Sequence, residues 1–542
     1  MSDSNRSWRF SALWRNDKEP LALDDKIYEL RREKLKQIEA LGQPPYPNKY
    51  RAHHTIERVR DEYESWTAEQ LTAAPPRVHL AGRIMTLRLM GKAGFAHLQS
   101  AARADRRGTG KLQVYVRHDG VGEKAFQLFK LLDIGDIIGV HGYLFRTKTG
   151  ELTIHVEDLT LLAKALLPLP EKWHGLTDVE LRYRQRYLDL IVNPEVREVF
   201  LARSRLVKSF RNFLDQHHFL EVETPMMQPV AGGAVARPFV THHNTLDMDL
   251  YLRIAPELYL KRLMVGGFDR VYEINRNFRN EGLGWRWNPE FTMLEFYQAY
   301  ADFRDIMELT QDLLIQAAID VTGGTKVKFG DHEIDWAPGN WTIMTMRQAI
   351  MQYWPRAAAP TPQMPDFSSP DRVGHLVQRF NQARSHIAYD PSEPAGKTIA
   401  ALFEAVVEEQ LIQPTIIYEF PAAVSPLSKN KPDEPDWTER FEIFAAQMEI
   451  SNGFSELNDP QEQRRRFEQQ LRQRERGDEE AHQMDEDYIR ALSFGLPPTG
   501  GCGVGVDRVA MLLTNSQTIR DVILFPLLRP ERISSADPAD SA

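Results

Sequence analysis

The stretch FRNEGLGWRWNPEFTMLEFY, Phe278 to Tyr297, decides the fold of the larger part of this 542-residue chain. It opens with Arg279 and Glu281 two positions apart, passes through a glycine-bearing turn and closes on an aromatic-acidic segment that holds Glu295 and Tyr297 at alternating positions. Alternating side chains of a strand lie on the same face of a sheet. The pattern therefore predicts a hairpin whose strands each have one polar and one apolar face.

A second stretch far downstream, GGCGVGVDR (Gly500 to Arg508), is a glycine-rich run that continues into the apolar helical segment VAMLL. Arg279 and Arg508 would then stand on separate elements around a glycine-lined floor. Guanidinium groups pair bidentately with phosphate oxygens, so this arrangement suits a nucleoside triphosphate. Alone, an Arg-x-Glu pair indicates a surface ion pair and a glycine-rich run indicates a turn, so it is their conjunction that points to a site.

These stretches resemble motifs 2 and 3 of class II aminoacyl-tRNA synthetases, and the lysine-specific bacterial members fit best. APELYLKRL (Ala255 to Leu263) and GFSELND (Gly453 to Asp459) match those enzymes in the same order. HFLEVETPMMQ (His218 to Gln228) resembles motif 1, which builds the dimer interface of the class, and predicts a long helix running into a strand that ends at Pro225. The resemblance covers roughly residues 24 to 530.

Composition narrows the class of protein. A chain of 542 residues exceeds one ordinary core and predicts at least two domains. Its 42% hydrophobic and 26% charged residues are typical of a globular protein in water, and we expect a cytoplasmic protein with no membrane segment. Cys502, the one cysteine, excludes an intrachain disulfide. A net charge of −9 argues against nonspecific coating of nucleic acid but leaves a tRNA partner possible.

The expected fold class is α+β, with an N-terminal OB-fold β-barrel and a class II synthetase catalytic domain whose antiparallel sheet is flanked by helices. Three strand-like runs, a helical run and two further strand-like runs between Val78 and Leu162 follow the order of an OB-fold, with Leu112, Val114 and Val116 pointing inward. The expected segments are a mobile tail (1–23), a helical segment (24–75), the OB-fold anticodon-binding domain (76–165), a linker (166–180), the catalytic domain (181–530) with a partly helical insertion near 355–397, and a disordered tail (531–542). The loop ARADRRGTG between the second and third strands is expected to be flexible.

The chemistry that the resemblance implies needs no general base, because the attacking carboxylate is already ionised at neutral pH. Two anions, the carboxylate and the triphosphate, must instead be brought together. The rate therefore depends mainly on cations, oriented hydrogen-bond donors and metal ions. Glu442 in RFEIF and Glu449 in MEISNG match the family's magnesium ligands. Two carboxylates with triphosphate oxygens form the sparse ligand set that Mg²⁺ prefers, and Mg²⁺ is the expected cofactor.

The resemblance also implies the residues that hold ATP. Arg279 would bridge the lysine carboxylate and the α-phosphate, and Glu281 would meet the adenine amino group. Phe291 would stack under the adenine, and Arg508 would close over its other face and reach the γ-phosphate. The expected ATP-binding residues are Arg279, Glu281, Trp287, Asn288, Phe291, Glu442 and Arg508, of which Arg279 and Arg508 are also the expected catalytic residues.

Lysine carries an ammonium group at each end, so its pocket needs two groups of carboxylates. By resemblance, Glu257 and the backbone of Gly233 form the α-amino site, and Glu456 forms the ε-ammonium site. The expected lysine-binding residues are Gly233, Glu257, Arg279, Glu295, Tyr297, Asn452 and Glu456. On the smaller domain, Arg88, Phe95 and Gln113 match the family's anticodon-binding positions, with Phe95 stacking on the central uridine and Arg88 on the turn before it.

One position departs from the family pattern within the expected site. The residue four before Phe291, which in the family is His or Arg and contacts the γ-phosphate, is Trp287, with Arg286 beside it. Met448 likewise replaces a basic residue just before Glu449. Because the other expected ATP and lysine residues are present, these differences predict an altered affinity for ATP and no loss of activity.

Three functions fit the sequence. The first is a lysine–tRNA ligase, which activates L-lysine with ATP and passes it to the terminal adenosine of tRNA-Lys, as a homodimer. The second is a paralogue that lysylates a protein, although such relatives generally lack an anticodon-binding domain. The third is a non-catalytic binding protein on the same scaffold, against which the expected metal ligands argue.

Overall fold

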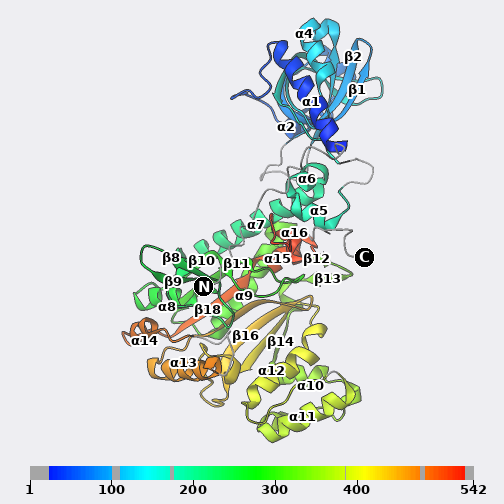
Figure 1. Cartoon of the computed structure of the whole chain (residues 1–542). Coiled ribbons are helices and arrows are strands. Elements are labelled where there is room, and N and C mark those ends of the chain that lie inside the picture. The colour runs from blue at the N-terminus through cyan, green and yellow to red at the C-terminus, as the bar shows by residue number, and fades with distance from the viewer. Residues whose placement is uncertain (1–22, 101–109, 171–175, 385, 476–482, 531–542) are drawn as a thin grey trace, which may run out of the picture. The chain divides into compact units, whose positions relative to one another are not determined.

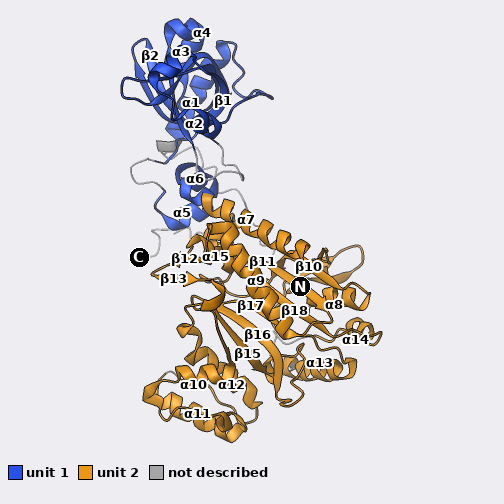
Figure 2. Ribbon diagram, turned by 180° about the vertical axis from the view of Figure 1, so that it is seen from behind, with its two compact units in different colours: residues 1–197 blue, residues 198–542 orange. Residues whose placement is uncertain are grey.

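The computed structural model describes residues 23–100, 110–170, 176–384, 386–475 and 483–530, which form two compact units divided after Arg197 (Figures 1 and 2). The division falls later in the chain than the linker predicted at 166–180. The predicted tails, apart from Leu23, lie outside the described residues, as does most of the charged loop between the second and third strands.

The first unit is built on a closed five-stranded barrel with strand order β1-β2-β3-β5-β4, as the OB-fold pattern predicts. Its strands are β1 (Arg77–Met90), β2 (Ala93–Gln99), β3 (Lys111–Arg117), β4 (Ile137–Arg146) and β5 (Leu152–Ala163). Leu112, Val114 and Val116 are buried inside the barrel, which confirms the predicted alternation of β3. The helices of this unit are α1 (Leu23–Ala40), α2 (Ile56–Tyr63), α3 (Ala68–Ala73), α4 (His118–Leu131), α5 (Val179–Arg184) and α6 (Arg186–Val192).

The second unit is organised around an eight-stranded sheet with strand order β14-β15-β16-β17-β18-β11-β10-β6. The strands are β6 (Leu220–Glu221), β10 (Arg270–Phe278), β11 (Glu290–Ala299), β14 (Thr342–Thr345), β15 (Thr415–Pro421), β16 (Trp437–Ala445), β17 (Met448–Ser455) and β18 (Thr499–Gly505). All neighbours are antiparallel except β14 with β15 and β6 with β10. Together with the barrel, this sheet confirms the predicted α+β class.

The register of this sheet joins the two stretches that decide the fold. Strands β10 and β11 form the predicted hairpin, with Asn277 opposite Phe291. Strand β18 then pairs with β11 on one side and β17 on the other, placing Gly501 opposite both Tyr297 and Phe454. Glycines have no side chain, so the centre of the sheet stays open on the face that carries the polar residues of β11.

Helices cover the other side of the sheet and build the main core. Helix α9 packs against β16, β17 and β18, and α15 follows directly from β18 (Figure 1). The helices of the second unit are α7 (Pro194–Gln216, which begins before the division), α8 (Glu257–Val265), α9 (Phe303–Thr322), α10 (Met346–Tyr353), α11 (Pro370–Ala383), α12 (Ala395–Val406), α13 (Pro460–Glu475), α14 (Glu486–Leu492), α15 (Val506–Thr514) and α16 (Ile519–Val522). No helix in the described part of the chain combines the length and the apolar character needed to cross a bilayer.

Shorter elements complete the unit. Two small sheets have the orders β12-β13 and β7-β9-β8, from β7 (Met227–Gln228), β8 (Val240–His243), β9 (Met248–Leu252), β12 (Lys326–Phe329) and β13 (His332–Asp335). The 3₁₀ turns are η1 (Pro338–Asn340), η2 (Arg356–Ala358), η3 (Met364–Phe367), η4 (Glu408–Gln410) and η5 (Ala422–Val424). Helices α10, α11 and α12 share a separate apolar core with β15, and the segment predicted to be a partly helical insertion contains η2, η3, all of α11 and the start of α12.

The prediction for the segment after α7 was wrong in one respect. The long helix is present, but strand β6 has only two residues and ends at Glu221 instead of Pro225. The backbone carbonyl of Thr224 accepts a hydrogen bond from the Arg253 side chain, and the Thr224 hydroxyl donates to Glu273. Around Thr224, hydrogen bonds to the side chains of Arg253 and Glu273 therefore take the place of backbone pairing with a neighbouring strand.

Candidate active site

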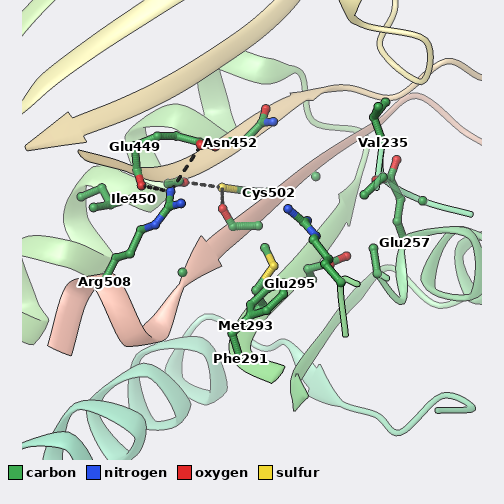
Figure 3. A pocket seen from close by; sticks show the side chains of 18 of the residues that line it. Val235, Glu257, Phe291, Met293, Glu295, Glu449, Ile450, Asn452, Cys502 and Arg508 are labelled. Atoms are coloured by element: carbon green, nitrogen blue, oxygen red, sulfur yellow. Dashed lines mark hydrogen bonds and ion pairs between the residues drawn. The ribbon is translucent and has the colours of Figure 1, made fainter. Parts of the chain in front are cut away.

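A pocket of about 380 Å³ opens on the polar face of the central sheet (Figure 3). Most of the residues that the sequence predicted for ATP, lysine and metal line it, from β11, β17, β18, α8, α15 and the loops between them. These are Gly233, Glu257, Arg279, Glu281, Trp287, Asn288, Phe291, Glu295, Tyr297, Glu449, Asn452, Glu456 and Arg508. The structure thus brings together residues that are far apart in the sequence.

The floor of the pocket is strand β18, where small residues make room for the side chains around them. A Cβ atom at Gly501 would lie 2.3 Å from Glu456 Oε1 and 2.5 Å from the Tyr297 ring. Cys502 is buried on the same strand, with its Sγ 3.0 Å from Ser451 Oγ, and burial raises the pKa of its thiol to about 12. Any side chain at Gly501 would therefore displace Glu456 or Tyr297.

Arg279 lies just beyond the end of β10, with its guanidinium carbon 5.1 Å from the centroid of the Phe291 ring. Burial lowers the pKa of Arg279, although a guanidinium remains charged at any ordinary pH. Its Nε is buried and has no hydrogen-bond partner within the described residues. A buried donor of this kind has a large free energy to gain from an anionic ligand.

Arg508 stands in the first turn of α15 and donates from Nη1 to the backbone oxygen of Glu449, with the Glu449 carboxylate 3.4 Å away (Figure 3). The residue before it fixes this turn in place. Asp507 accepts a hydrogen bond of 2.7 Å from the backbone N–H of Thr292 and pairs with Arg203 of α7. The start of α15 is therefore tied to both β11 and α7, so Arg508 is held at the pocket.

Arg286 and Trp287 lie in the loop between β10 and β11, so the strict alternation of a strand does not apply to them. Both line the pocket. Trp287 is 49% exposed and packs over Gly284, where a Cβ would lie 2.5 Å from its ring. Burial and the neighbouring Arg508 lower the pKa of Arg286. Arg286 therefore adds a second positive group near Arg508.

The opposite end of the pocket is strongly acidic and buried. Glu295 is 4% exposed and accepts a hydrogen bond from the Tyr297 hydroxyl at 3.2 Å. Burial, assisted by the nearby Glu257, raises the pKa of Glu295 to about 8. Glu257 and Glu456 are buried beside it, and Lys261 pairs with both. The sequence analysis missed Lys261, because a lysine in a short helix is most often at the surface.

Gly233 approaches this acidic end through its backbone. Its φ of 90° is readily adopted only by glycine, and a Cβ there would lie 3.2 Å from the Cβ of Glu257. The backbone of Gly233 can therefore come close to the position predicted for the α-amino group. Glycine is required both for the conformation and for the space.

Glu442 and Glu449 lie on neighbouring strands, β16 and β17, where Glu442 is opposite Asn452. Glu442 does not line the pocket and is paired with Arg440, which also donates to Asn452 at 3.2 Å. Burial raises the pKa of Glu442 to about 8 against the opposing effect of Arg440. Arg440, which lines the pocket, was also missed, although its place two residues before Glu442 predicts the same face of the strand.

Glu442 and Glu449 suit a metal ion only when a bound substrate supplies further oxygen ligands. Among the described residues no group of three or more His, Cys, Asp or Glu side chains could hold an ion. Two carboxylates on adjacent strands form a sparse ligand set that phosphate oxygens of a bound ligand would complete.

On the barrel, the predicted anticodon residues lie on adjacent strands. Phe95 of β2 is half-buried on the outer side and stacks on Tyr115 of β3, with ring centroids 4.6 Å apart. Gln113 donates to Glu151 and accepts from Thr153. Arg88 was expected on a turn, but it lies within β1 and is the register partner of Phe95. The reason is that β1 is longer than predicted and continues to Met90.

Comparison with known proteins agrees with this geometry. Residues 178–529 match the family of tRNA synthetases class II (D, K and N), and residues 78–162 match the OB-fold nucleic acid binding domain. A lysine–tRNA ligase of Pelotomaculum thermopropionicum is 52% identical over 506 residues, covering 93% of this chain and 95% of the relative. Lysine–tRNA ligases of Halalkalibacterium halodurans and Thermoanaerobacter sp. are 51% and 48% identical, over 94% and 98% of this chain and 98% and 100% of the relatives.

The match over residues 178–529, together with the antiparallel sheet and the pocket on its polar face, shows that the chain belongs to the class II tRNA synthetases. Within that class it falls among the lysine–tRNA ligases, which are ligase enzymes.

Proposed function

We propose that the pocket joins L-lysine to ATP and that the resulting lysyl group is passed to the terminal adenosine of tRNA-Lys. The observation that carries this proposal is the division of the pocket. Three of its arginines, Arg279, Arg286 and Arg508, lie in the hairpin loop and the turn after β18, whereas Glu257, Glu295 and Glu456 form the buried acidic end. A substrate with an ammonium at each end and a triphosphate partner fits this distribution of charge.

In the first step a carboxylate oxygen of lysine attacks the α-phosphorus of ATP. The bond from this phosphorus to the bridging oxygen breaks, pyrophosphate leaves with the electron pair, and lysyl-adenylate forms. Arg279 stabilises the charge that develops between carboxylate and phosphate, and its unpartnered Nε supports that role. Phe291 stacks beneath the adenine, Glu281 and Asn288 hold its edge, and Arg508 covers its other face.

In the second step a ribose hydroxyl of the terminal adenosine attacks the lysyl carbonyl carbon. The bond from this carbon to the phosphate oxygen breaks, and AMP leaves with the electron pair while the hydroxyl proton passes to its phosphate. Glu257 and the Gly233 backbone hold the α-ammonium throughout, while Glu456, Tyr297 and Asn452 hold the ε-ammonium. Glu295 completes this acidic end. Since both ammonium groups stay bound, the carbonyl carbon remains in place between the two steps.

Glu442 and Glu449 would hold Mg²⁺ together with oxygens of ATP. The ion supplies neutralising charge for the triphosphate and for the leaving pyrophosphate. In the structure the guanidinium group of Arg440 pairs with the carboxylate of Glu442, where the metal ion would bind. Arg440 would therefore release Glu442 when the metal arrives with ATP.

The barrel would bind the anticodon of tRNA-Lys through Phe95, Gln113 and Arg88. The half-buried Phe95 ring lies on the outer side of β2, opposite exposed Arg88. This supports the role, since an aromatic ring can stack on a base and a neighbouring arginine can pair with a phosphate.

We also propose a cytoplasmic homodimer. Its support is a set of exposed apolar side chains in and near β6 and the sheet β7-β9-β8: Leu220, Met226, Met227, Val240, Leu246 and Met248.

Lysine-dependent exchange of pyrophosphate into ATP tests the first step, and charging of tRNA-Lys tests the second. We expect both reactions, with exchange lost on chelation of divalent metal and restored by Mg²⁺. Exchange without charging, or charging of a protein in place of tRNA, would contradict the proposal. Sedimentation velocity should give a dimer that Val240→Asp dissociates, and a monomeric wild type would remove the dimer.

A further inference from the structure

Lys261 is a buried cation behind the acidic end of the pocket. It lies on α8 one turn after Glu257, is 0% exposed and stands outside the lining of the cavity. Its Nζ is 2.6 Å from Glu257 Oε1 and also forms an ion pair with Glu456 Oε2. One ammonium group thus connects the carboxylates that the proposed function gives to the two ends of lysine.

We propose that Lys261 is a positioning residue that holds Glu257 and Glu456 in the orientation that receives the substrate lysine. This inference rests on the proposed roles of those two carboxylates. Glu456 presents its two oxygens to different partners. Oε2 faces Lys261, whereas Oε1 lies beside Gly501 and the Tyr297 ring on the pocket side. Lys261 therefore fixes one oxygen and leaves the other for the ε-ammonium group.

Other side chains enclose Lys261 on several sides. Its Nζ lies 5.3 Å from the centroid of the Phe454 ring, and the Tyr488 hydroxyl is buried close by. Phe454 stands on β17 two residues before Glu456, and Tyr488 is on α14, which packs against α8. The ammonium is therefore enclosed by three elements and cannot reach water.

The charges support the same conclusion. Burial raises the pKa of Glu257 and Glu456, and Lys261 limits that rise for both. Burial likewise disfavours the ammonium of Lys261, but the two carboxylates outweigh this effect and raise its pKa. A neutral residue at 261 would leave two buried acids side by side without a cation. Their pKa values would then rise further, and the protonated acids would bind an ammonium group poorly.

The test is the exchange reaction with Lys261→Met, which keeps the length of the side chain and removes its charge. We expect the KM for lysine to rise by about 10-fold or more, while the KM for ATP and kcat change by less than about 3-fold. The preference for lysine over ornithine should fall as well, because a loosened Glu456 no longer fixes the length of the substrate. Lys261→Arg, which keeps the charge, should recover part of the affinity for lysine.

Lys164 supplies a matched control in the barrel. Its side chain is also 0% exposed and pairs with two carboxylates, Asp133 and Asp136. Lys164→Met should lower the unfolding temperature as Lys261→Met does, without changing the KM for lysine in exchange. If Lys261→Met does not fold, Lys261→Gln, which keeps a hydrogen-bond donor without the charge, gives the same measurement.

An unchanged KM for lysine in the neutral variants would show that Lys261 only stabilises the fold, and a lowered KM would show that it competes with the substrate for Glu456. Either result overturns the proposal. Glu456→Gln, measured in parallel, separates this failure from failure of the proposed function. If Glu456→Gln raises the KM for lysine by about 10- to 150-fold and Lys261→Met does not, only the role of Lys261 is wrong. If Glu456→Gln has no effect, the assignment of the ε-ammonium site is wrong.

Discussion

The guanidinium carbon of Arg286 lies 4.1 Å from the centroid of the Trp285 ring. Arg286 also lines the pocket, near Arg508. The adjacent Trp287 also lines the pocket but carries no charge. A cation at position 286 can therefore meet the end of a triphosphate that an indole at position 287 cannot neutralise.

Arg286→Ala should raise the KM for ATP by about 10- to 150-fold, because a charge-assisted hydrogen bond is lost. Trp287→His should leave exchange intact and lower the KM for ATP by adding a polar ring near the same phosphate. Both values come from exchange at varied ATP with lysine saturating. If Trp287→His abolishes exchange, the indole has a packing or adenylate-binding role. If Arg286→Ala leaves the KM for ATP unchanged, Arg286 does not reach the phosphate.

The raised pKa of Glu295, about 8, predicts a dependence of lysine binding on pH. Below pH 8 this carboxyl is protonated in the empty pocket, and the ammonium groups of lysine bind best when it is ionised. The KM for lysine should therefore fall as the pH rises from 7 to about 8.5. Glu295→Gln should weaken this dependence, with wild type measured in the same buffers as the control. A KM that rises over this range contradicts the assignment.

The same group affects the stability of the ligand-free protein. Its folded pKa lies above its unfolded value of 4.5, so the folded state binds more protons between these two values. Its contribution to the free energy of unfolding is therefore largest below pH 4.5 and declines as the pH rises toward 8. Saturating lysine should reduce that decline, which thermal unfolding with and without lysine will measure.

Gly501→Ala should damage lysine binding selectively. The added Cβ would overlap Glu456 Oε1 and the Tyr297 ring, so we expect the KM for lysine to rise by about 10-fold or more with a smaller change in the KM for ATP. Gly503→Ala is the matched control, because its Cβ would meet only the flexible end of Met293 within 3 Å. Equal effects of the two variants on lysine would exclude a specific clash at position 501.

Phe95→Ala distinguishes the contribution of the barrel from that of the pocket. Loss of base stacking should weaken charging of tRNA-Lys by about 1–3 kcal/mol and leave exchange unchanged, because lysyl-adenylate forms without the anticodon. Phe126→Ala, which empties a buried position of the barrel core, is the control for simple unfolding. Should Phe95→Ala lower the unfolding temperature as much as Phe126→Ala, the ring is structural.

The sequence predicted those parts of the structure that depend on local pattern. The order of the strand-like runs predicted the barrel, and the patterning of Phe278 to Tyr297 predicted the β10–β11 hairpin. The central sheet and most of the pocket lining were expected from the resemblance to class II synthetases. The length of β6 could not be predicted, because the groups that replace its neighbours, such as the Arg253 side chain, come from another segment. Lys261 was missed for the same reason. Its partner Glu456 is far away in the sequence, and nothing in PELYLKRL distinguishes a buried lysine from a surface one.

Chemical labelling of Cys502 can report on opening of the central sheet. The one sulfhydryl of the chain is buried on β18, between β17 and β11, in the wall of the pocket, and its high pKa keeps it in the unreactive thiol form. An alkylating reagent can reach it only when the central sheet opens, so the labelling rate measures how often that occurs. Ligands that fill the cavity above β18 should slow the labelling, which gives an affinity without any turnover.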